Sequence, residues 1–435
     1  MLEALFYTAR CRHDCKARFI NILEDMRLKM EQKRVAFIND VSYGSTGKIV
    51  KGIASVAKEN NDQPFIYFGW TKNYRKSDRE DTMVGSFLGK FFHMYWSRIT
   101  GKKGCYSKRD TKKLIKKLYE FKPDVINLHI LHANATNLPM LFNYIKKNNI
   151  KVVWTFHDCW AFTGHCPHFI IAKCDKWKTG CYECPQYRGY PYSYVDKSKK
   201  MYQLKKEWFT GINDMTIVTP SKWLGELVKE SFLKDYPVEI INNGIDLTLF
   251  KPTESDFREK HSLENKKIVL GVSLGWTNKK GLDVFCELAK RLPSNYQIVL
   301  VGTDDKIDKI LPNNIISIHR TANQQELAMI YSESDVFVNP TREDTFPTVN
   351  IESLACGTPI VTFKTGGSPE ILDDTCGVVV DVDDIDAMEK SILNVCENNR
   401  FSSEACLKRA SNFDMWDKFR LYCDLFEKEK EKTKK

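Results

Sequence analysis

The sequence contains no run of about 18 consecutive uncharged apolar residues, the length that a helix needs to cross a bilayer. Its first 25 residues also lack the apolar core of a secretory signal, since Arg10, Arg12 and Lys16 interrupt them. Acidic residues are fewer than basic ones, 56 against 66, so the formal net charge is +10. We therefore expect a cytoplasmic protein with an anionic partner, which charge alone leaves open between nucleic acid, an anionic membrane surface and a phosphorylated substrate.

Apolar or β-branched runs alternate with helical segments along the chain, a pattern typical of parallel sheets with crossover helices. The first set of expected strands comprises 35–38, 65–68, 125–128, 152–155 and 216–219. Beyond a turn-rich, polar stretch at 233–265, the second set comprises 268–271, 297–302, 336–338 and 359–362. The expected helices include 110–121, 137–148 and 221–232. The fold class is therefore α/β, with two doubly wound, Rossmann-like domains that face each other across a cleft at the carboxyl ends of their strands.

The expected domain limits follow from this alternation. Residues 30–240 form the N-terminal domain and residues 241–411 the C-terminal domain. An aromatic helix within 412–435 packs back on the fold and ends in a charged tail. Residues 1–29 match neither set, so we interpret them as an extension outside the fold or as the result of a misplaced start codon, with Met30 as the natural start.

The segment 339–359 carries the most informative pattern, because a strand, a loop and a helix follow one another there. Pro347 suits the first helical turn and Gly357 ends the helix. The N–H groups near Thr348 and Val349 point out of the helix start, which favours binding of a diphosphate. Glu352, one turn further on, is placed to accept hydrogen bonds from two ribose hydroxyls. Phe346, just before the helix, is the last member of this predicted nucleotide-binding set.

The N-terminal half contains a second candidate for phosphate binding. Small residues at Gly44–Lys48 stand between the first strand and a helix expected from about residue 47, and Gly44 and Gly47 allow a close approach of backbone to phosphate. A Walker P-loop is excluded, because Ser42 stands where its first glycine is needed. An ordinary tight turn is the alternative interpretation.

A cysteine-rich insertion occupies 159–190. The chain has 14 cysteines, which we expect to be reduced. Four of those in the insertion are candidate zinc ligands: Cys166, Cys174, Cys181 and Cys184. The last two have zinc-knuckle spacing, and a metal would hold a loop that has few aliphatic residues. A structural zinc site, in which His165 or His168 replaces one thiolate, is one interpretation; reduced, partly buried thiols are the other.

Residues 87–122 combine aromatic side chains with many lysines and arginines. Such a surface suits anionic lipid headgroups, so peripheral contact with the inner face of a membrane is one prediction. The alternative is a solvated helix face over an ordinary core.

These motifs resemble the signature of the large retaining glycosyltransferase family four, whose members have the two-domain GT-B fold. Further landmarks of that family occur in the expected order: 218–223, 243–246, 279–281, 334–337 and 366–370. The resemblance covers most of 31–425. The insertion after His157 is similar to that of exopolysaccharide transferases of the colanic acid type.

The resemblance implies an enzyme that moves a hexose with retention from a nucleotide-diphosphate sugar to a glycan or polyprenyl-linked acceptor in surface polysaccharide, capsule or lipopolysaccharide synthesis. The acceptor would lie on the N-terminal side and the donor on the C-terminal side. No metal is required for transfer in this family. Zinc in the insertion would therefore be structural.

The resemblance also implies roles for single residues. Glu352 holds the donor ribose, Lys280 neutralises the donor phosphates, and His157 reaches the donor sugar or phosphate. Asp344 stands where the family usually has glutamate and would contact the sugar hydroxyls, with Glu343 beside it. The arginine that usually precedes the lysine is absent.

Two other functions fit parts of the sequence. A nucleotide-sugar epimerase of the same architecture would share the cleft but need different acid and base residues. A basic nucleic-acid-binding protein would explain the net charge and a zinc knuckle, and its binding would depend steeply on salt. The order of the family landmarks favours the transferase over both, and no nucleic-acid partner is expected.

Overall fold

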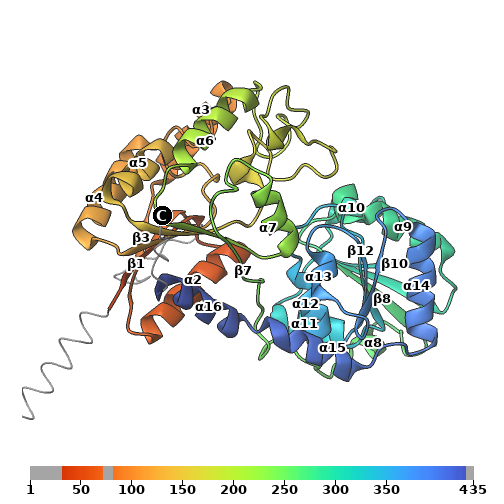
Figure 1. Cartoon of the computed structure of the whole chain (residues 1–435). Coiled ribbons are helices and arrows are strands. Elements are labelled where there is room, and N and C mark those ends of the chain that lie inside the picture. Colours follow the sequence, from red (N-terminus) through yellow and green to blue (C-terminus); the bar gives the residue numbers. More distant parts are fainter. Residues whose placement is uncertain (1–31, 72–81, 428–435) are drawn as a thin grey trace, which may run out of the picture.

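The computed structural model of the chain describes residues 32–71 and 82–427. The extension predicted at 1–29 and the tail from 428 lie outside these residues. Two parallel sheets form two lobes, shown side by side in Figure 1. The prediction of two doubly wound domains is confirmed.

The first sheet has seven strands in the order β3-β2-β1-β4-β5-β6-β7. Its strands are β1 Arg34–Val41, β2 Gln63–Trp70, β3 Thr82–Val84, β4 Val125–Leu128, β5 Lys151–Thr155, β6 Met215–Thr219 and β7 Val238–Ile240. Its helices are α2 Gly44–Glu59, α3 Phe87–Thr100, α4 Lys108–Phe121, α5 Leu138–Asn148, α6 Ser198–Phe209 and α7 Lys222–Lys229. Because the order reverses between β1 and β4, the loops after these two strands diverge and leave a crevice for a ligand.

The second sheet has six strands in the order β10-β9-β8-β11-β12-β13. They are β8 Lys267–Val272, β9 Tyr296–Val301, β10 Ile315–Ile318, β11 Val336–Asn339, β12 Ile360–Phe363 and β13 Gly377–Val380. The helices are α8 Phe257–Lys260, α9 Leu282–Arg291, α10 Asp305–Asp308, α11 Gln324–Ser332, α12 Thr348–Ala355, α13 Ser368–Ile371, α14 Ile385–Glu397 and α15 Ser403–Ala410. Here the order reverses between β8 and β11, which places α12 at the switch point.

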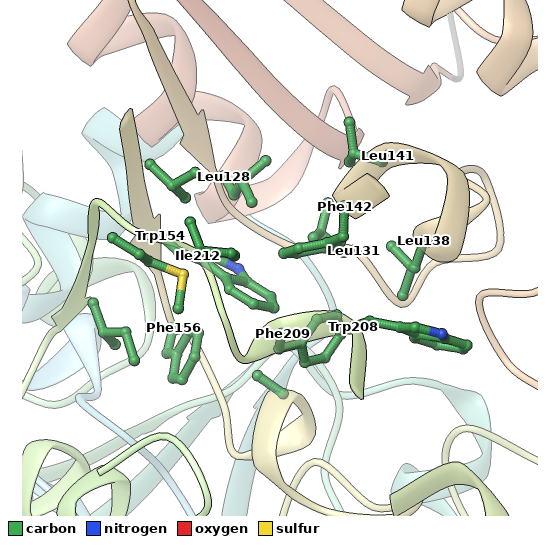
Figure 2. Close-up of a cluster of buried hydrophobic side chains, with 14 of the residues drawn as sticks. Leu128, Leu131, Leu138, Leu141, Phe142, Trp154, Phe156, Trp208, Phe209 and Ile212 are labelled. Carbon is green, nitrogen blue, oxygen red and sulfur yellow. The ribbon is translucent and has the colours of Figure 1, made fainter. Parts of the chain in front are cut away.

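Helices cover both faces of each parallel sheet. This burial explains why the strands are continuous apolar runs. On one face of the first sheet, Trp154 packs against Phe142 and Phe209 with ring centroids 5.3 and 4.8 Å apart (Figure 2). The indole nitrogen of Trp154 donates to the carbonyl oxygen of His129 at 3.1 Å. This bond ties the loop after β4, which belongs to the crevice, directly to the core.

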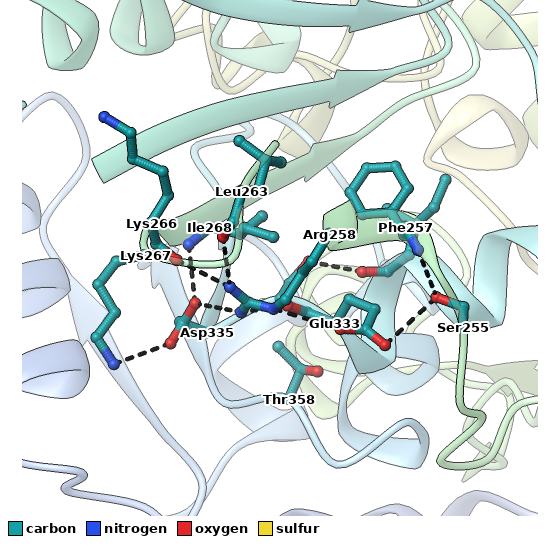
Figure 3. Close-up of polar contacts among 12 residues, drawn as sticks. Ser255, Phe257, Arg258, Leu263, Lys266, Lys267, Ile268, Glu333, Asp335 and Thr358 are labelled. Atoms are coloured by element: carbon teal, nitrogen blue, oxygen red, sulfur yellow. Dashed lines mark hydrogen bonds and ion pairs between the residues drawn. The ribbon is translucent and has the colours of Figure 1, made fainter. Parts of the chain in front are cut away.

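The start of β11 is fixed by a half-buried polar cluster (Figure 3). Asp335 accepts a hydrogen bond from the Ile268 N–H and one from Arg258 Nη2, both at 2.8 Å. Arg258, which lies on α8 in the connection between the two sheets, also donates to the Glu333 carbonyl at 2.6 Å. The connection is thereby pinned to the strand that leads into α12.

Two segments differ from the sequence prediction. The Gly44–Lys48 stretch is not a loop before a helix, because α2 begins at Gly44. A side chain at Gly47 would lie 2.4 Å from the Ser42 carbonyl carbon, so glycine allows the first turn to close directly onto the end of the strand. The 233–265 stretch contains β7 and α8, which are too short to give a periodic pattern.

The C-terminal helix α16, Met415–Glu427, crosses back to the first lobe and lies beside α2 (Figure 1). Phe426 is 1% exposed and meets Phe37 of β1 edge to face, with centroids 6.0 Å apart. The helix therefore covers the face of the first sheet that α4 and α5 leave open.

Phe426→Ala should destabilise the first domain by about 3–5 kcal/mol, because it empties a packed site beneath β1. Leu421→Ala on the same helix is the matched control, since Leu421 is 42% exposed, and should change stability by no more than about 0.5 kcal/mol. Chemical denaturation of both variants measures the difference. Equal stabilities would show that α16 is not part of the first core.

Candidate functional site

The site centres on the start of α12, just after β11. Pro347 is the N-cap residue, and no side chain caps the helix. Gly357 follows the helix end with φ 84°, as expected for a glycine stop. The structure therefore has the predicted strand, loop and helix, with N–H groups of the first turn available to an anion. Thr348 and Val349 lie in this turn and are both half-buried.

Glu352 lies one turn into α12, facing the preceding helix. The hydroxyl of Tyr331 donates to Glu352 Oε2 at 3.3 Å. Burial raises the pKa of Glu352 to about 7, although the Tyr331 bond and the charge of Lys48 act against it. A ligand that donates two hydroxyl groups would favour the ionised form, because hydrogen bonds to a carboxylate lower its pKa.

Lys48 comes from α2 of the other domain. Its Nζ donates to Gln324 Oε1 of α11 at 3.0 Å. The first turn of α2, which contains the predicted residues Gly44 and Gly47, therefore borders the same space as Glu352. Lys48 is near enough to Glu352 for its charge to act on the carboxylate, so the start of α2 and Glu352 lie on facing parts of the two domains.

The loop between β11 and α12 carries three charged residues in a row. Asp344 pairs with Lys280, with Oδ2 and Nζ 2.8 Å apart. Glu343, only 3% exposed, pairs with Lys279 at 2.5 Å. Arg342 forms two bonds to Asp283, at 2.8 and 2.9 Å. The loop is thus held to the η3 turn, Asn278–Lys280, and the start of α9 by paired charges.

The turn after β12 supports this loop from behind. Gly366 has φ 52°, and a side chain there would meet the carbonyl oxygen of Asp344 at 1.7 Å. The Gly367 N–H donates to the Thr345 carbonyl at 3.1 Å. Glycine at 366 is therefore required for the backbone of 344–345 to lie where it does. Phe346 is 2% exposed and packs against Phe413, so its side chain supports the loop from the core.

His157 follows β5 on the first-domain side. Its Nε2 lies 3.1 Å from His129 Nδ1, and the two rings are stacked. Burial lowers the pKa of His157 to about 4, which makes the ring neutral at pH 7. Its carbonyl oxygen accepts a bond from Thr345 Oγ1 at 3.0 Å. The structure therefore places His157 beside the Asp344 loop, across the domain boundary.

A histidine–aspartate pair in the same region, His132 with Asp158, was not predicted. His132 Nε2 lies 2.8 Å from Asp158 Oδ2, and its Nδ1 lies 3.5 Å from the Tyr190 hydroxyl. Burial alone would raise the pKa of Asp158, but the charge and hydrogen bond of His132 hold it at about 2. Together with His129, His157 and Trp160, this pair lines a small pocket. The signal available in the sequence was the pair of histidines three apart, directly after the strand 125–128.

Glu343 was named only as a neighbour of Asp344, yet it joins the two domains. Its Oε1 accepts the N–H of Ile171, in the cysteine-rich insertion, at 3.0 Å. Glu370 makes a similar link, accepting the N–H groups of Lys222 and Trp223 at the start of α7, both at 2.8 Å. Only the three-dimensional structure shows that these partners meet.

The cysteines of the insertion lie near one another but do not form a tight ligand set. Cys166 is buried, and Cys174, Cys181 and Cys184 are half-buried. Among residues 32–71 and 82–427, three or more candidate ligand atoms lie within 4.8 Å of one another only at the exposed Asp305, Asp308 and His319. The zinc prediction therefore stays a prediction, and it is taken up below.

Comparison with known proteins relates both lobes to sugar transferases. Residues 84–249 match the family model Glycosyltransferase Family 4, and residues 266–398 match Glycosyl transferases group 1. Together the two matches cover well over half of the chain. Each match lies on one of the two sheets.

Curated relatives are distant. A putative colanic acid biosynthesis glycosyl transferase of Escherichia coli is 23% identical over 60% of this chain and 65% of its own length. A processive diacylglycerol alpha-glucosyltransferase of Acholeplasma laidlawii is 30% identical over 35% of this chain and 48% of its own. The chain thus matches less than two thirds of the length of either relative.

Solved structures share the fold at low identity. Anabaena HepE, in complex with UDP-glucose, superposes with a TM-score of 0.63 at 14% identity, over 91% of this chain and 99% of HepE. WaaG, a glycosyltransferase involved in lipopolysaccharide biosynthesis, also has a TM-score of 0.63 at 14% identity, over 91% of this chain and 100% of WaaG. The predicted GT-B architecture is confirmed.

Glu352→Gln should change how stability depends on pH. The folded pKa of about 7 lies above the ordinary 4.5, so the stability associated with the protonated carboxyl is complete below pH 4.5 and is lost as pH rises through 7. In the ligand-free protein, Glu352→Gln should therefore gain about 2–3 kcal/mol over wild type at about pH 8.5 and little at about pH 5. Urea unfolding at both pH values measures this. A difference that does not change with pH would contradict the raised pKa.

Proposed function

The chain belongs to glycosyltransferase family 4, and from this premise we propose that it transfers a sugar with retention from a nucleotide-diphosphate sugar to a glycan or lipid-linked acceptor of surface polysaccharide synthesis. The observation that carries the proposal is the position of Glu352. It lies one turn behind an uncapped helix start, at the switch point of the second sheet and opposite the first turn of α2.

The donor binds with its diphosphate at the first turn of α12 and its ribose at Glu352. The N–H groups near Thr348 and Val349 face the phosphate oxygens, and the dipole of α12 favours their charge. Lys280 adds a cation once the phosphate replaces Asp344 as its partner. Support for such a donor comes from Anabaena HepE, which is described in complex with UDP-glucose.

Transfer requires the bond between the sugar's anomeric carbon and the diphosphate to break while the bond to the acceptor oxygen forms. The diphosphate leaves with the bonding electrons, and one of its oxygens takes the acceptor's proton. Lys280 and the α12 start stabilise the departing charge. Asp344, released from Lys280, accepts hydrogen bonds from sugar hydroxyls, and the neutral ring of His157 contacts the sugar from the first domain. No protein base and no metal enters this scheme.

The acceptor binds on the first domain, next to the small pocket that His157 shares with His132 and Asp158. His132 is buried, with Nε2 on Asp158 and Nδ1 at 3.5 Å from the Tyr190 hydroxyl. Aromatic rings beside polar groups suit a sugar, which presents both C–H faces and hydroxyls.

Peripheral membrane contact is proposed for α3. Along this helix the exposed side chains are Phe87, Leu88, Phe91, Phe92, Tyr95 and Trp96. Phe92 is 66% exposed, and the basic residues Arg98 and Lys102 follow at the C-terminal end. Apolar insertion with nearby positive charge suits an anionic lipid surface, where lipid-linked acceptors reside. Of the helices within 32–71 and 82–427, none is long and apolar enough to cross a membrane.

Glu352→Ala should weaken binding of the donor nucleotide by more than about 30-fold, because two hydrogen bonds to a charged group are lost. Calorimetric titration with nucleoside diphosphates, together with turnover of nucleotide sugars, measures the loss. Glu404→Ala, which removes an exposed carboxylate from α15, is the control and should bind normally. Unchanged turnover in folded Glu352→Ala would refute the site.

Replacing Phe91 and Phe92 together by alanine should lower binding to anionic vesicles at low salt by at least about tenfold, since each ring contributes roughly 1.5 kcal/mol or more when buried. Ile310→Ala, which changes a 63% exposed residue of the second domain, should leave vesicle binding intact. Co-sedimentation with vesicles that contain acidic lipids gives both values. Vesicle binding by the Phe91/Phe92 double variant that equals wild type would show that α3 is not the contact surface.

A further inference from the structure

The cysteine-rich insertion builds one wall of the cleft although it has little regular structure. Between β5 and α6 the chain forms only two short 3-10 turns, at Trp160–Phe162 and Lys176–Lys178. A segment of this length without helices or strands needs another source of order. Its position nevertheless matters, because Tyr190 approaches His132 and the Ile171 N–H binds Glu343.

Sulfur atoms gather inside this insertion. The side chains of Cys166 and Cys184 are hydrogen-bonded to each other. Cys181 Sγ accepts the Gly164 N–H at 3.1 Å, the kind of bond that stabilises a thiolate. Cys181 is also close enough to Cys174 and Cys184 for their charges to interact. The four thiols thus form one neighbourhood, although no three sulfurs of the described chain lie within 4.8 Å of one another.

The chain packs tightly where this neighbourhood begins. A side chain at Gly164 would lie 2.6 Å from Cys181 Cβ and 2.4 Å from the carbonyl oxygen of Ser198. Glycine at this position lets the Cys166 segment reach the Cys181 segment. The backbone is therefore shaped to bring the segment that contains Cys166 next to the segment that contains Cys181.

A buried lysine lies next to the thiols. Lys205 on α6 is 0% exposed, and its Nζ donates to the carbonyl oxygens of Trp160 and Thr163 at 2.6 and 3.0 Å. It also lies 3.3 Å from the Trp160 ring centre. Within the described chain no carboxylate is within ion-pair distance of it, although Asp158, Cys166 and Cys181 are near enough to interact with its charge. Burial holds the pKa of Lys205 well below its usual range, and its amine is positioned to offset part of any negative charge that gathers on the thiols.

We propose that Cys166, Cys174, Cys181 and Cys184 bind one structural Zn²⁺. Thiolate sulfur is a preferred ligand of zinc, and four thiolates around Zn²⁺ carry a net charge of −2, of which one positive charge on Lys205 would offset half. Binding draws the sulfurs into a tetrahedron and releases the thiol protons to solvent. With all four positions filled by protein, the ion has no open site for substrate. It fixes the insertion and, through it, the wall that carries Tyr190 and Ile171.

Two other arrangements are distinguishable from this one. A disulfide between Cys166 and Cys184 would use the two sulfurs already in contact. A mixed site would replace one thiolate by His165, which is 8% exposed and whose Nε2 has no hydrogen-bond partner. The experiment therefore names an outcome for each.

The test is elemental analysis of the full chain, purified under reducing conditions from cells supplied with zinc. Wild type should contain about one zinc per chain, and Cys174→Ser and Cys181→Ser less than about one tenth of that. Cys286→Ser is the matched control, because Cys286 is a half-buried thiol on α9, and it should keep the metal. His165→Gln should keep it as well.

Cobalt substitution and chelation are applied to the wild-type protein, so their results do not depend on whether the cysteine variants fold. Wild type loaded with Co²⁺ should show the sulfur-to-cobalt charge transfer and the visible bands of a tetrahedral site. Removal of zinc by a chelator should lower the melting temperature, and nucleoside diphosphate binding by the second domain serves as a separate readout of the proposed function. Folded, metal-free wild type, a Cys166–Cys184 disulfide that persists under reducing conditions, or loss of zinc in His165→Gln would each overturn the four-thiolate site.

Discussion

The loop between β11 and α12 is the part of the molecule where the two domains bond to each other around the candidate site. Glu343 binds the Ile171 N–H and Thr345 binds the His157 carbonyl, while Glu370 holds the start of α7 from the next loop. Gly366 makes room for this backbone, and Asp335 fixes the strand that precedes it. Any change in the relative position of the domains must therefore break bonds in this loop, which also carries Asp344.

The same loop explains how the cleft can be ordered without a ligand. Asp344 neutralises Lys280, and Glu343 neutralises Lys279, so Lys280, the proposed phosphate partner, already has a counter-ion. In the proposed complex, a diphosphate replaces Asp344 as the partner of Lys280, so binding exchanges one ion pair for another. Glu352 is the exception, because burial raises its pKa and it has no ion-pair partner among the described residues, only hydrogen bonds from the Tyr331 and Thr348 side chains. Its missing partners are what ribose hydroxyls would supply.

The sequence was sufficient for the repeated elements and for the strand, loop and helix at β11 and α12. Buried parallel strands are continuous apolar runs, and the proline and glycine around α12 mark its limits, so both were predicted closely. Strands β3, β10 and β13 were not predicted; they lie at sheet edges and are mostly half-buried, unlike the buried central strands. The role of Glu343, the pairing of His132 with Asp158 and the neighbourhood of Lys205 depend on residues far apart in the chain. Such contacts are set by tertiary packing, which local pattern does not contain.

The most direct test of this account is a crystal structure of the chain with a nucleoside diphosphate bound. The diphosphate should lie at the first turn of α12 with Lys280 on its oxygens, and both ribose hydroxyls should bond to Glu352. Asp344 should then be free of Lys280 and directed toward the space beside His157. A nucleotide bound at the first sheet, or one whose ribose makes no contact with Glu352, would contradict the account.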